Sequence, residues 1–345
     1  MTHTSESSES SALGTPDAPD APDASGPRTL RAELETLTTE AFRPELADVD
    51  RLPTLGIARL MNGEDATVAA AVAERLPAIA AAIDAVAERM ARGGRLIYAG
   101  AGTAGRLGVL DASECPPTFN TDPGQVVGLI AGGPGALVTS VEGAEDSAEL
   151  AAADLDALAL TADDTVVGVS ASGRTPYAVG AVTHARTRGA LTVGLACNAG
   201  SPLAAAAGHG IEVVVGPELL TGSTRLKAGT AQKLVLNMIS TITMIRLGKT
   251  YGNLMVDVRA SNEKLRARSR RIVALATGAA DTDIERALAA TDGEVKNAIL
   301  VLLADVDGPT AARLLTGSHG HLRTALAQAP EPAPGPAPGP QDATS

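Results

Sequence analysis

Two acidic residues stand where a carboxyl group could do acid–base chemistry. Glu114 lies in the run DASECPP, directly before a pair of prolines that would hold it in one direction, and Glu145 lies in the acidic run VEGAEDS. Like-charged neighbours and partial burial raise the pKa of a carboxyl group, so one group can stay protonated as an acid while another acts as a base. The alternatives remain open: Glu114 as a plain surface carboxylate, and VEGAEDS as the acidic first turn of a helix.

Hydroxyl side chains gather in three glycine-containing segments, GAGTAG from residue 100, SASGRTP from residue 170 and TGSTRLK from residue 221. Backbone N–H groups and hydroxyls in such turns can bind an anion, and a following helix adds the partial positive charge of its N-terminus. The pattern predicts a phosphate site. The candidate binding residues are Gly102, Thr103, Ser170, Ser172, Gly173, Arg174, Thr175, Ser223 and Lys227.

Each segment also has a second interpretation. The first fits G-x-G-x-x-G, but a dinucleotide site needs an acidic residue roughly 20 positions further on. The next apolar run, Val126–Ile130, ends without one, and the prolines at 116–117 predict a helix that is cut short. The hydroxyls of the second segment would serve equally as a helix N-cap. In the third, the cations Arg225 and Lys227 would instead pair with a carboxylate such as Glu218.

The elements that must position these residues alternate between short apolar strands and helices. Such alternation predicts an α/β fold with a mostly parallel sheet, in which ligands lie beyond the carboxyl ends of the strands. The predicted strands are Leu96–Ala99, Val126–Ile130, Thr165–Val169, Leu191–Ala196 and Ile211–Val215, and the predicted crossovers include Ala136–Ala157 and Pro176–Arg188.

Helices are predicted outside this region as well. Leu30, Leu34 and Leu37 recur at helical spacing, and Ala66–Met90 carries one long apolar stripe. A long helix follows TGSTRLK and runs to about Leu247. The C-terminal part predicts three short helices and no strand, at Asp283–Ala290, Val295–Val306 and Thr310–Thr316.

Composition divides the chain into four parts. Residues 1–27 contain a PDAPDAPDA repeat, and residues 330–345 are rich in proline, so both are expected to be disordered tails. Residues 28–275 are expected to form the domain that carries the predicted phosphate site, together with its N-terminal helices. Residues 276–329 are expected to form a small helical domain.

Charge and composition exclude several functions. The 345-residue chain has a formal net charge of −12 and does not concentrate Lys and Arg, which argues against a nucleic-acid partner. The two cysteines are far apart and form no CxxC pair, so neither a disulfide framework nor a metal site is expected. With neither a signal peptide nor a membrane span expected, the predicted location is the cytoplasm.

Longer motifs then resemble those of the N-acetylmuramic acid 6-phosphate etherase family. They are GRLIYAGAGTAGRLGVLDASECPPTF, VEGAEDS, VVGVSASGRTPY, CNAGSPL, TGSTRLKAGTAQKLVLNM and YGNLMVDVRASNEKLR. The resemblance implies a sugar isomerase (SIS) domain, which is a three-layer sandwich of helices around a mostly parallel sheet. It also implies a homodimer, with the site near the subunit interface, that works without metal or nucleotide cofactor.

The resemblance further implies a reaction and two roles. The D-lactyl ether of N-acetylmuramate 6-phosphate would be cleaved by elimination and hydration to N-acetylglucosamine 6-phosphate and D-lactate, in recycling of cell-wall sugar. Glu114 maps onto the family's proton donor and Glu145 onto its second catalytic carboxylate. Two departures stand out: Ala104 replaces a hydroxyl residue that the family usually has, and Thr38–Asp65 follows the family pattern poorly.

Three rival functions share the predicted domain. A non-catalytic sugar-phosphate sensor, as in glucokinase regulatory protein, would need the hydroxyl loops but neither glutamate. An aldose–ketose isomerase would need no acid aimed at C3. A transcription regulator is disfavoured because nothing before Arg92 reads as a basic recognition helix.

Overall fold

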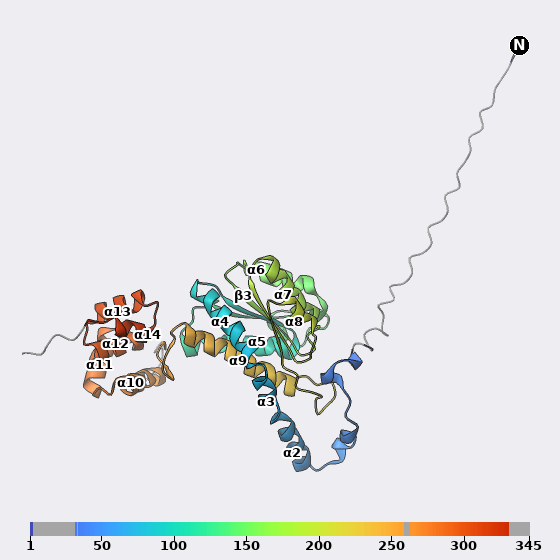
Figure 1. The fold of residues 1–345 in the computed structure, drawn as a ribbon, viewed down its shortest axis with the longest axis horizontal. Coiled ribbons are helices and arrows are strands. Elements are labelled where there is room, and N and C mark those ends of the chain that lie inside the picture. Colours follow the sequence, from blue (N-terminus) through green and yellow to red (C-terminus); the bar gives the residue numbers. More distant parts are fainter. Residues whose placement is uncertain (3–31, 33, 259–262, 331–345) are drawn as a thin grey trace, which may run out of the picture.

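The structure is a computed structural model that describes residues 1–2, 32, 34–258 and 263–330. Nearly all of the two predicted tails, and Leu30 of the first predicted helix, lie outside the described residues. The described residues form a layered α/β body and a separate bundle of short helices, joined in sequence through residues 256–263 (Figure 1).

A five-stranded sheet forms the centre of the body, in the order β2-β1-β3-β4-β5, and every neighbouring pair is parallel. This confirms the predicted fold class. The last strand begins earlier than the predicted Ile211–Val215 because His209 already pairs with Val193, and it ends earlier because its partner β4 ends at Ala196, opposite Glu212. The strands are β1 (Leu96–Gly100), β2 (Val126–Ile130), β3 (Thr165–Ser170), β4 (Leu191–Ala196) and β5 (His209–Glu212).

Helices cover both faces of the sheet (Figure 1). Leu96 and Tyr98 of β1 pack with α3, α4, α5 and α9, whereas Ile97 and Ala99 pack on the other face with α6 and α7. Successive side chains of a strand point to opposite faces, so a strand covered on both sides is apolar throughout. The helices of the body are α2 (Thr54–Asp65), α3 (Val68–Ala73), α4 (Leu76–Ala91), α5 (Gly102–Phe119), α6 (Ala148–Ala157), α7 (Pro176–Thr187), α8 (Pro202–Ala206) and α9 (Lys227–Arg246).

The stripe predicted as one helix over Ala66–Met90 is two helices, which corrects that prediction. The chain breaks at Glu74 and Arg75, and Pro77 lies in the first turn of α4. Proline has no N–H to donate and its ring clashes with the preceding turn, so it favours the start of a helix over its interior. The stripe still faces the core.

The glycine-rich loop leads into a longer helix than predicted. α5 runs for 18 residues and contains Pro116 and Pro117, which the sequence had suggested would end it. The prolines lie in the last turns, where they remove only two backbone hydrogen bonds, and buried Phe119 anchors the end of the helix. The helix ends at Asn120, which takes the left-handed conformation at φ +50°. Glu114 is therefore a helical residue.

The C-terminal helices have a hydrophobic core of their own. That core includes Ile272 and Val273 of α10, which the predicted division had placed in the catalytic domain; the division itself stays a prediction. A short antiparallel hairpin, β6 (Thr250–Tyr251) and β7 (Leu254–Met255), precedes the bundle. The helices are α10 (Glu263–Thr277), α11 (Asp281–Ala290), α12 (Val295–Ala304), α13 (Gly308–Gly317) and α14 (Leu322–Ala327).

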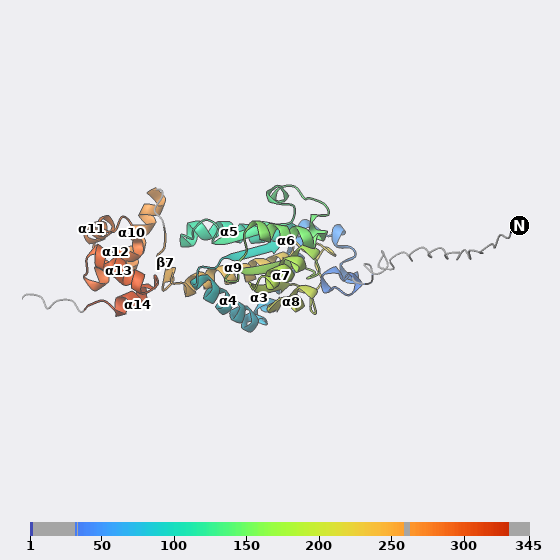
Figure 2. The ribbon, with the colours of Figure 1, turned by 90° about the horizontal axis from the view of Figure 1, so that it is seen from above.

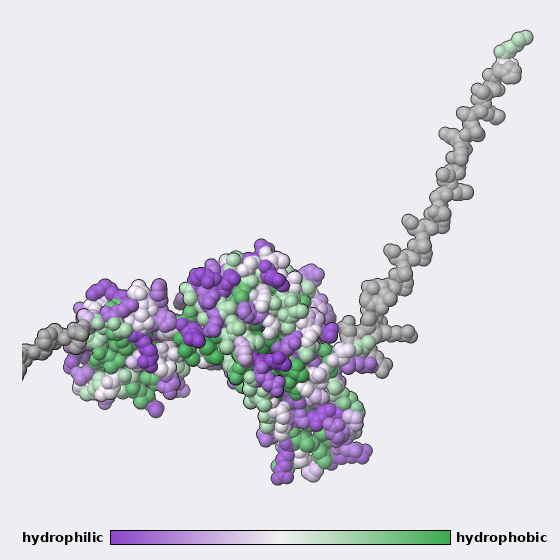
Figure 3. All heavy atoms as spheres, viewed as in Figure 1, coloured by the Kyte–Doolittle hydropathy of each residue, from purple (hydrophilic) through white to green (hydrophobic). Residues whose placement is uncertain are grey.

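Helix α2 projects from the body and buries none of its residues (Figure 1). Leu55 and Met61 of α2 are exposed, and hydrophobic surface is visible on this projecting part in Figure 3. Further exposed apolar side chains lie on the outer faces of α5 and α9, at Leu110, Ile242 and Ile245.

Candidate active site

The strand order places the candidate site. After β1 the chain crosses to one neighbour, β2, and β3 then pairs on the other side of β1. Ligands of open α/β sheets bind at such a point, beyond the carboxyl ends of the strands where the order reverses. A cavity of about 350 Å³ lies there. Its lining residues include Gly102, Thr103, Ala104, Glu145, Ser170, Ser172, Thr175, Thr224 and Gln232.

The first loop is shaped by its glycines. Gly102 has φ +53°, a left-handed conformation that glycine adopts without strain. A Cβ on Gly105 would lie 2.6 Å from the carbonyl oxygen of Gly100, so glycine lets the start of α5 pack directly on β1. The G-x-G-x-x-G pattern thus serves close packing, and it leaves Thr103 on the cavity wall beside buried Ala104.

The second loop is a hydroxyl cluster that is hydrogen-bonded within itself. Ser170 Oγ lies 2.8 Å from Thr175 Oγ1 and 3.2 Å from Ser172 Oγ, and it accepts a hydrogen bond from the backbone N–H of Gly173. Thr175 occupies the N-cap position of α7, yet its side chain makes no capping hydrogen bond. The Nε atom of Arg174 is buried and has no partner among the described residues.

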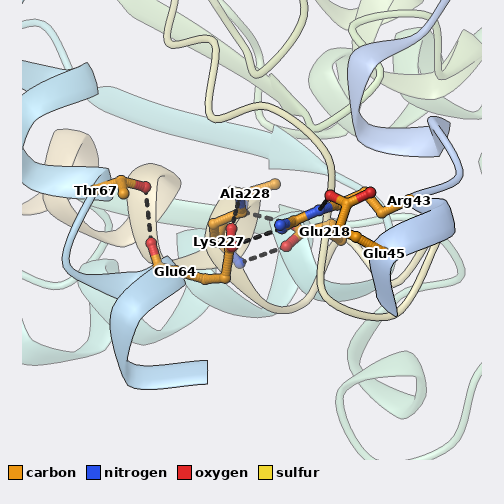
Figure 4. Close-up of polar contacts among 7 residues, drawn as sticks. All are labelled: Arg43, Glu45, Glu64, Thr67, Glu218, Lys227 and Ala228. Carbon is orange, nitrogen blue, oxygen red and sulfur yellow. Dashed lines mark hydrogen bonds and ion pairs between the residues drawn. The ribbon is translucent and has the colours of Figure 1, made fainter. Parts of the chain in front are cut away.

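The third segment, TGSTRLK, contributes a different residue to the cavity from those predicted. Neither Ser223 nor Lys227 lines the cavity, whereas Thr224 does. The carboxylate of Glu218 accepts hydrogen bonds from the backbone N–H groups of Lys227 and Ala228, both at 2.9 Å (Figure 4). The anion at the N-terminus of α9 is therefore one of the protein's own carboxylates.

The side chain of Lys227 is buried in an ion-pair cluster (Figure 4). Its Nζ donates to Glu64 Oε2 at 2.6 Å, and the other oxygen of Glu64 accepts from Arg43. Burial alone would raise the pKa of Glu64, but the hydrogen bonds from Arg43 and Lys227 outweigh it and lower the pKa. The cluster joins the N-terminal segment to α9. The side chain of Lys227 therefore pairs with Glu64 and not with the predicted partner Glu218.

Glu145 reaches the cavity from a short helix, η5 (Ala144–Asp146), that precedes α6. It also lines an adjoining cavity of about 110 Å³, together with Arg106 and Glu142. Ser147 caps α6 by accepting a hydrogen bond from the backbone N–H of Leu150 at 3.0 Å. This cap fixes the point at which the chain passes from η5 into α6.

Glu114 lies elsewhere. It lines a cavity of about 490 Å³ at the far end of α5, with Asn237 and Asn253 among its neighbours. Thr103 and Glu114 are eleven residues apart on α5, which at 1.5 Å per residue places their backbones roughly 16 Å apart. Figure 2 shows α5 lying along the body with one end towards the helical bundle. One chain therefore does not bring Glu114 together with Glu145.

Beside Glu114 is a buried carboxylate that the sequence did not single out. Asp111 accepts hydrogen bonds from Tyr98 Oη (2.7 Å), Asn237 Nδ2 (2.6 Å) and Ser240 Oγ (3.1 Å). Burial raises the pKa of Asp111, although these hydrogen bonds act to lower it. The network ties α5 to β1 and α9, and it holds the helical turn that carries Glu114.

The sequence prediction also missed Glu40 and Gln232, which line the cavity with the hydroxyl loops. Glu40 lies in the segment Thr38–Asp65 that follows the family pattern poorly, and Gln232 lies in the motif TGSTRLKAGTAQK beyond its hydroxyl cluster. In the part of the chain that the structure describes, no group of three His, Cys, Asp or Glu residues could hold a metal ion.

No single described helix is long and apolar enough to cross a membrane. By length and composition alone, the bent pair Thr54–Ala73 and Leu76–Ala91 passes the same test.

The sheet order and the hydroxyl-rich loops at the reversal point define a SIS domain, the class of domain that binds sugar phosphates. Two family models agree: the SIS domain matches residues 143–242, and the glucokinase regulatory protein N-terminal SIS domain matches residues 78–186. The solved structure of a phosphoheptose isomerase from Francisella tularensis matches 56% of this chain and all of its own, with 18% identity and a TM-score of 0.45.

Relatives over nearly the whole chain are more specific. An N-acetylmuramic acid 6-phosphate etherase from Streptomyces coelicolor is 89% identical over 87% of this chain and 96% of its own length. One from Rubrobacter xylanophilus is 61% identical over 87% of this chain and 99% of its own. The chain belongs to the N-acetylmuramic acid 6-phosphate etherase family.

Proposed function

We propose that this protein cleaves the D-lactyl ether of N-acetylmuramate 6-phosphate, giving N-acetylglucosamine 6-phosphate and D-lactate in the recycling of cell-wall sugar. It is a carbon–oxygen lyase. The observation that carries the proposal is the 350 Å³ cavity at the reversal point of the sheet, which combines three hydroxyl-bearing loops with the carboxylate of Glu145. The etherase relatives support it.

The phosphate is bound by the loops after β1 and β3. Gly102, Thr103 and the hydroxyls of Ser170, Ser172 and Thr175 surround the cavity. The free first turns of α5 and α7 add N–H donors and a favourable helix dipole. Gly173 and Arg174 complete the second loop, and the unpartnered Nε of Arg174 is a donor still available there.

Ser223 and Lys227 are weaker members of the proposed phosphate site. Ser223 does not line the cavity, and Lys227 would have to exchange its ion pair with Glu64 for the phosphate. Ala104 offers no hydroxyl, so the other loop residues make the remaining hydrogen bonds.

The chemistry is an elimination followed by a hydration. A base takes the proton at C2, next to the aldehyde of the opened sugar, and the lactyl oxygen leaves C3 with a proton from an acid. Water then adds to the unsaturated intermediate at C3. A lactate alkoxide is a poor leaving group unless it is protonated, and the C2 proton needs a base, so two carboxyl groups suit the reaction. Glu114 is the proton donor and Glu145 the second carboxylate.

The distance between the two glutamates within one chain supports a homodimer with its site near the subunit interface. The second subunit would supply Glu114 to the cavity that contains Glu145, as a symmetric pair of chains allows. The exposed apolar side chains of α2, α5 and α9 provide surface for such a contact. The reaction needs no metal or organic cofactor and takes place in the cytoplasm.

A sugar-phosphate sensor is the alternative, and the match to the glucokinase regulatory protein SIS model concerns residues 78–186 only. The etherase relatives extend over most of the chain, so they favour the enzyme. The deciding experiment incubates the protein with N-acetylmuramate 6-phosphate and measures D-lactate and N-acetylglucosamine 6-phosphate. An etherase releases the two in equal amounts. Binding of the sugar phosphate without D-lactate would refute the proposal in favour of a sensor.

A further inference from the structure

Two polar side chains of the 350 Å³ cavity have no part in the phosphate loops or in the acid–base pair. Glu40 ends the short helix η1 (Thr38–Glu40), and Gln232 lies on the second turn of α9. Both line the cavity that contains Glu145. They lie 192 residues apart in the sequence, so only the fold brings them to the same cavity.

The backbone around Glu40 is fixed by the body of the protein. Asn198 Oδ1 accepts from the backbone N–H of Thr38 (2.8 Å) and from its hydroxyl (2.9 Å), and Asn198 Nδ2 donates to Thr39 Oγ1 (3.1 Å). The N–H of Gly222 donates to the carbonyl of Thr39 at 3.3 Å. A short turn held at four points positions the residue that follows it.

The backbone next to Glu40 is held in place, but the Glu40 side chain has no polar partner among the described residues. It is half-buried, and among the described residues no side chain hydrogen-bonds or ion-pairs with it. Its carboxylate lies against Gly222, where a Cβ would come within 2.5 Å of Oε2. A carboxylate only accepts hydrogen bonds and would repel a phosphate. Glu40 therefore faces a part of the ligand that donates.

Gln232 offers the opposite kind of group, a hydrogen-bond donor without an acceptor. It is 1% exposed, and its Nε2 is buried with no hydrogen-bond partner in the described part of the chain. An unpaired buried donor is costly, and such groups are rare in folded proteins. Because the side chain lines the cavity, an acceptor on a bound ligand would satisfy it.

An acetamido group offers one N–H donor and one carbonyl acceptor. We propose that Glu40 and Gln232 bind the 2-acetamido group of the sugar phosphate: its N–H donates to the Glu40 carboxylate, and its carbonyl accepts from Gln232 Nε2. The inference rests on the proposed function and names the residues that select a 2-acetamido sugar over a 2-hydroxy sugar. They are specificity residues, distinct from the groups that move protons.

The test compares three ligands by titration calorimetry on the full chain: N-acetylglucosamine 6-phosphate, glucose 6-phosphate and inorganic phosphate. Gln232→Met and Glu40→Met keep the side-chain length and remove the hydrogen bond. Each should weaken N-acetylglucosamine 6-phosphate binding by roughly 10-fold, the usual effect of one buried hydrogen bond. Binding of glucose 6-phosphate and of inorganic phosphate should change by less than about 2-fold. The control Thr103→Val should weaken all three alike.

Kinetics separate binding from chemistry. Both Met variants should raise KM about 10-fold and leave kcat within about 3-fold, as the loss of a contact made equally in ground and transition states predicts. A large fall in kcat with unchanged affinity would overturn the proposal by assigning the residue to catalysis. Equal weakening of both sugar phosphates, or no change at all, would overturn it as well.

The outcome does not depend on the etherase reaction. Failure of the wild-type chain to release D-lactate would refute the proposed function, while the preference for the acetamido sugar could still be measured. Thermal unfolding shows whether each variant folds. If Gln232→Met does not fold, Glu40→Met decides, because the Glu40 carboxylate has no partner to lose among the residues that the structure describes.

Discussion

Glu114 gains its direction from the residue one helical turn before it. Asp111 is anchored to Tyr98, Asn237 and Ser240, so the turn of α5 that carries Glu114 cannot rotate without breaking three hydrogen bonds. The Glu114 side chain remains exposed beside this buried network. A carboxyl group that is accessible and is carried on a rigid helical turn is suitable for donating a proton to the leaving group of a substrate bound in the other subunit.

The proposed role of Glu114 as proton donor gives the first prediction. Glu114→Gln keeps the shape of the side chain and removes the acidic proton. D-lactate release should therefore fall by about 100-fold to 10,000-fold, the usual range for the loss of a general acid. Affinity for N-acetylglucosamine 6-phosphate should stay within about 3-fold. Glu88→Gln, an exposed carboxylate on α4, is the matched control and should keep full activity. Full activity of Glu114→Gln would refute the role.

At the scale of elements, the contact between β1 and α5 depends on the absence of side chains. Gly100 and Gly105 allow the helix to start directly against the strand, and this places the glycine-rich loop at residues 100–105. The other end of β1 is held differently. Asp164, only 2% exposed, accepts from the backbone N–H of Arg95 (2.8 Å) and from its guanidinium (2.7 Å), and it ties the starts of β1 and β3 together.

The close contact predicts opposite effects for two glycines. Gly105→Ala would place a Cβ 2.6 Å from Gly100 O and 2.7 Å from Ile130 Cγ1, and such overpacking costs about 1–3 kcal/mol of the free energy of unfolding. Gly63→Ala, in α2 with nothing within 4 Å, should instead stabilise by about 0.5–1 kcal/mol. Urea unfolding of both variants measures the difference. Equal effects would mean that the glycine contact does not constrain the loop.

The Arg95–Asp164 pair predicts a dependence on pH. Burial would raise the pKa of Asp164, but hydrogen bonds from Arg95 and from the Thr161 and Arg95 backbones outweigh it and lower the pKa to about 2. A carboxyl group whose pKa is lowered by folding stabilises the fold at pH values above its ordinary pKa near 4. This stabilisation is lost as the pH falls towards 2. Asp164→Asn should therefore lose about 2 kcal/mol at pH 7 and much less near pH 2.5.

The adjacent Asp163 supplies a control for this measurement. It pairs with Arg92 at 2.9 Å, but both side chains are 51% exposed, so Asp163→Asn should cost less than about 1 kcal/mol at either pH. Chemical denaturation at the two pH values gives both differences. An Asp164→Asn loss that is the same at pH 7 and pH 2.5 would contradict the lowered pKa.

Much of the fold was predictable because its patterns are local. Apolar runs gave the strands, and glycines and hydroxyls marked the loops that meet at the reversal point. The sequence could not show that Pro116 and Pro117 lie inside α5, because packing of Phe119 outweighs their local preference. Nor could it show that Lys227 is held by Glu64, 163 residues away, or that Glu40 reaches the cavity. These depend on long-range contacts that local spacing does not encode.

At the scale of the whole molecule, the candidate chemistry is divided between two cavities. The hydroxyl loops and Glu145 share one of them, and Glu114 lines another at the far end of α5. Several exposed apolar side chains lie on α2, α5 and α9. An assembly that covers these surfaces and joins unlike cavities of two chains would complete the site.

This division predicts complementation between inactive variants. Co-expressed Glu114→Gln and Glu145→Gln chains should recover about a quarter of the wild-type activity, because half of the dimers are mixed and each has one intact site of two. Size-exclusion chromatography with light scattering should show twice the 34.6 kDa chain mass. Each variant alone should be inactive. A dimer whose mixed form regains nothing would mean that both glutamates act from the same chain.

The length of α5 has a consequence for the dimeric site. Its 18 residues set the separation between the loop at one end and Glu114 near the other. One inserted residue would swing everything after it by about 100° and push it about 1.5 Å further. In a two-fold symmetric dimer, each α5 would set the distance between the loop of one site and the Glu114 of the other. A single insertion would therefore displace the proton donor of both sites at once.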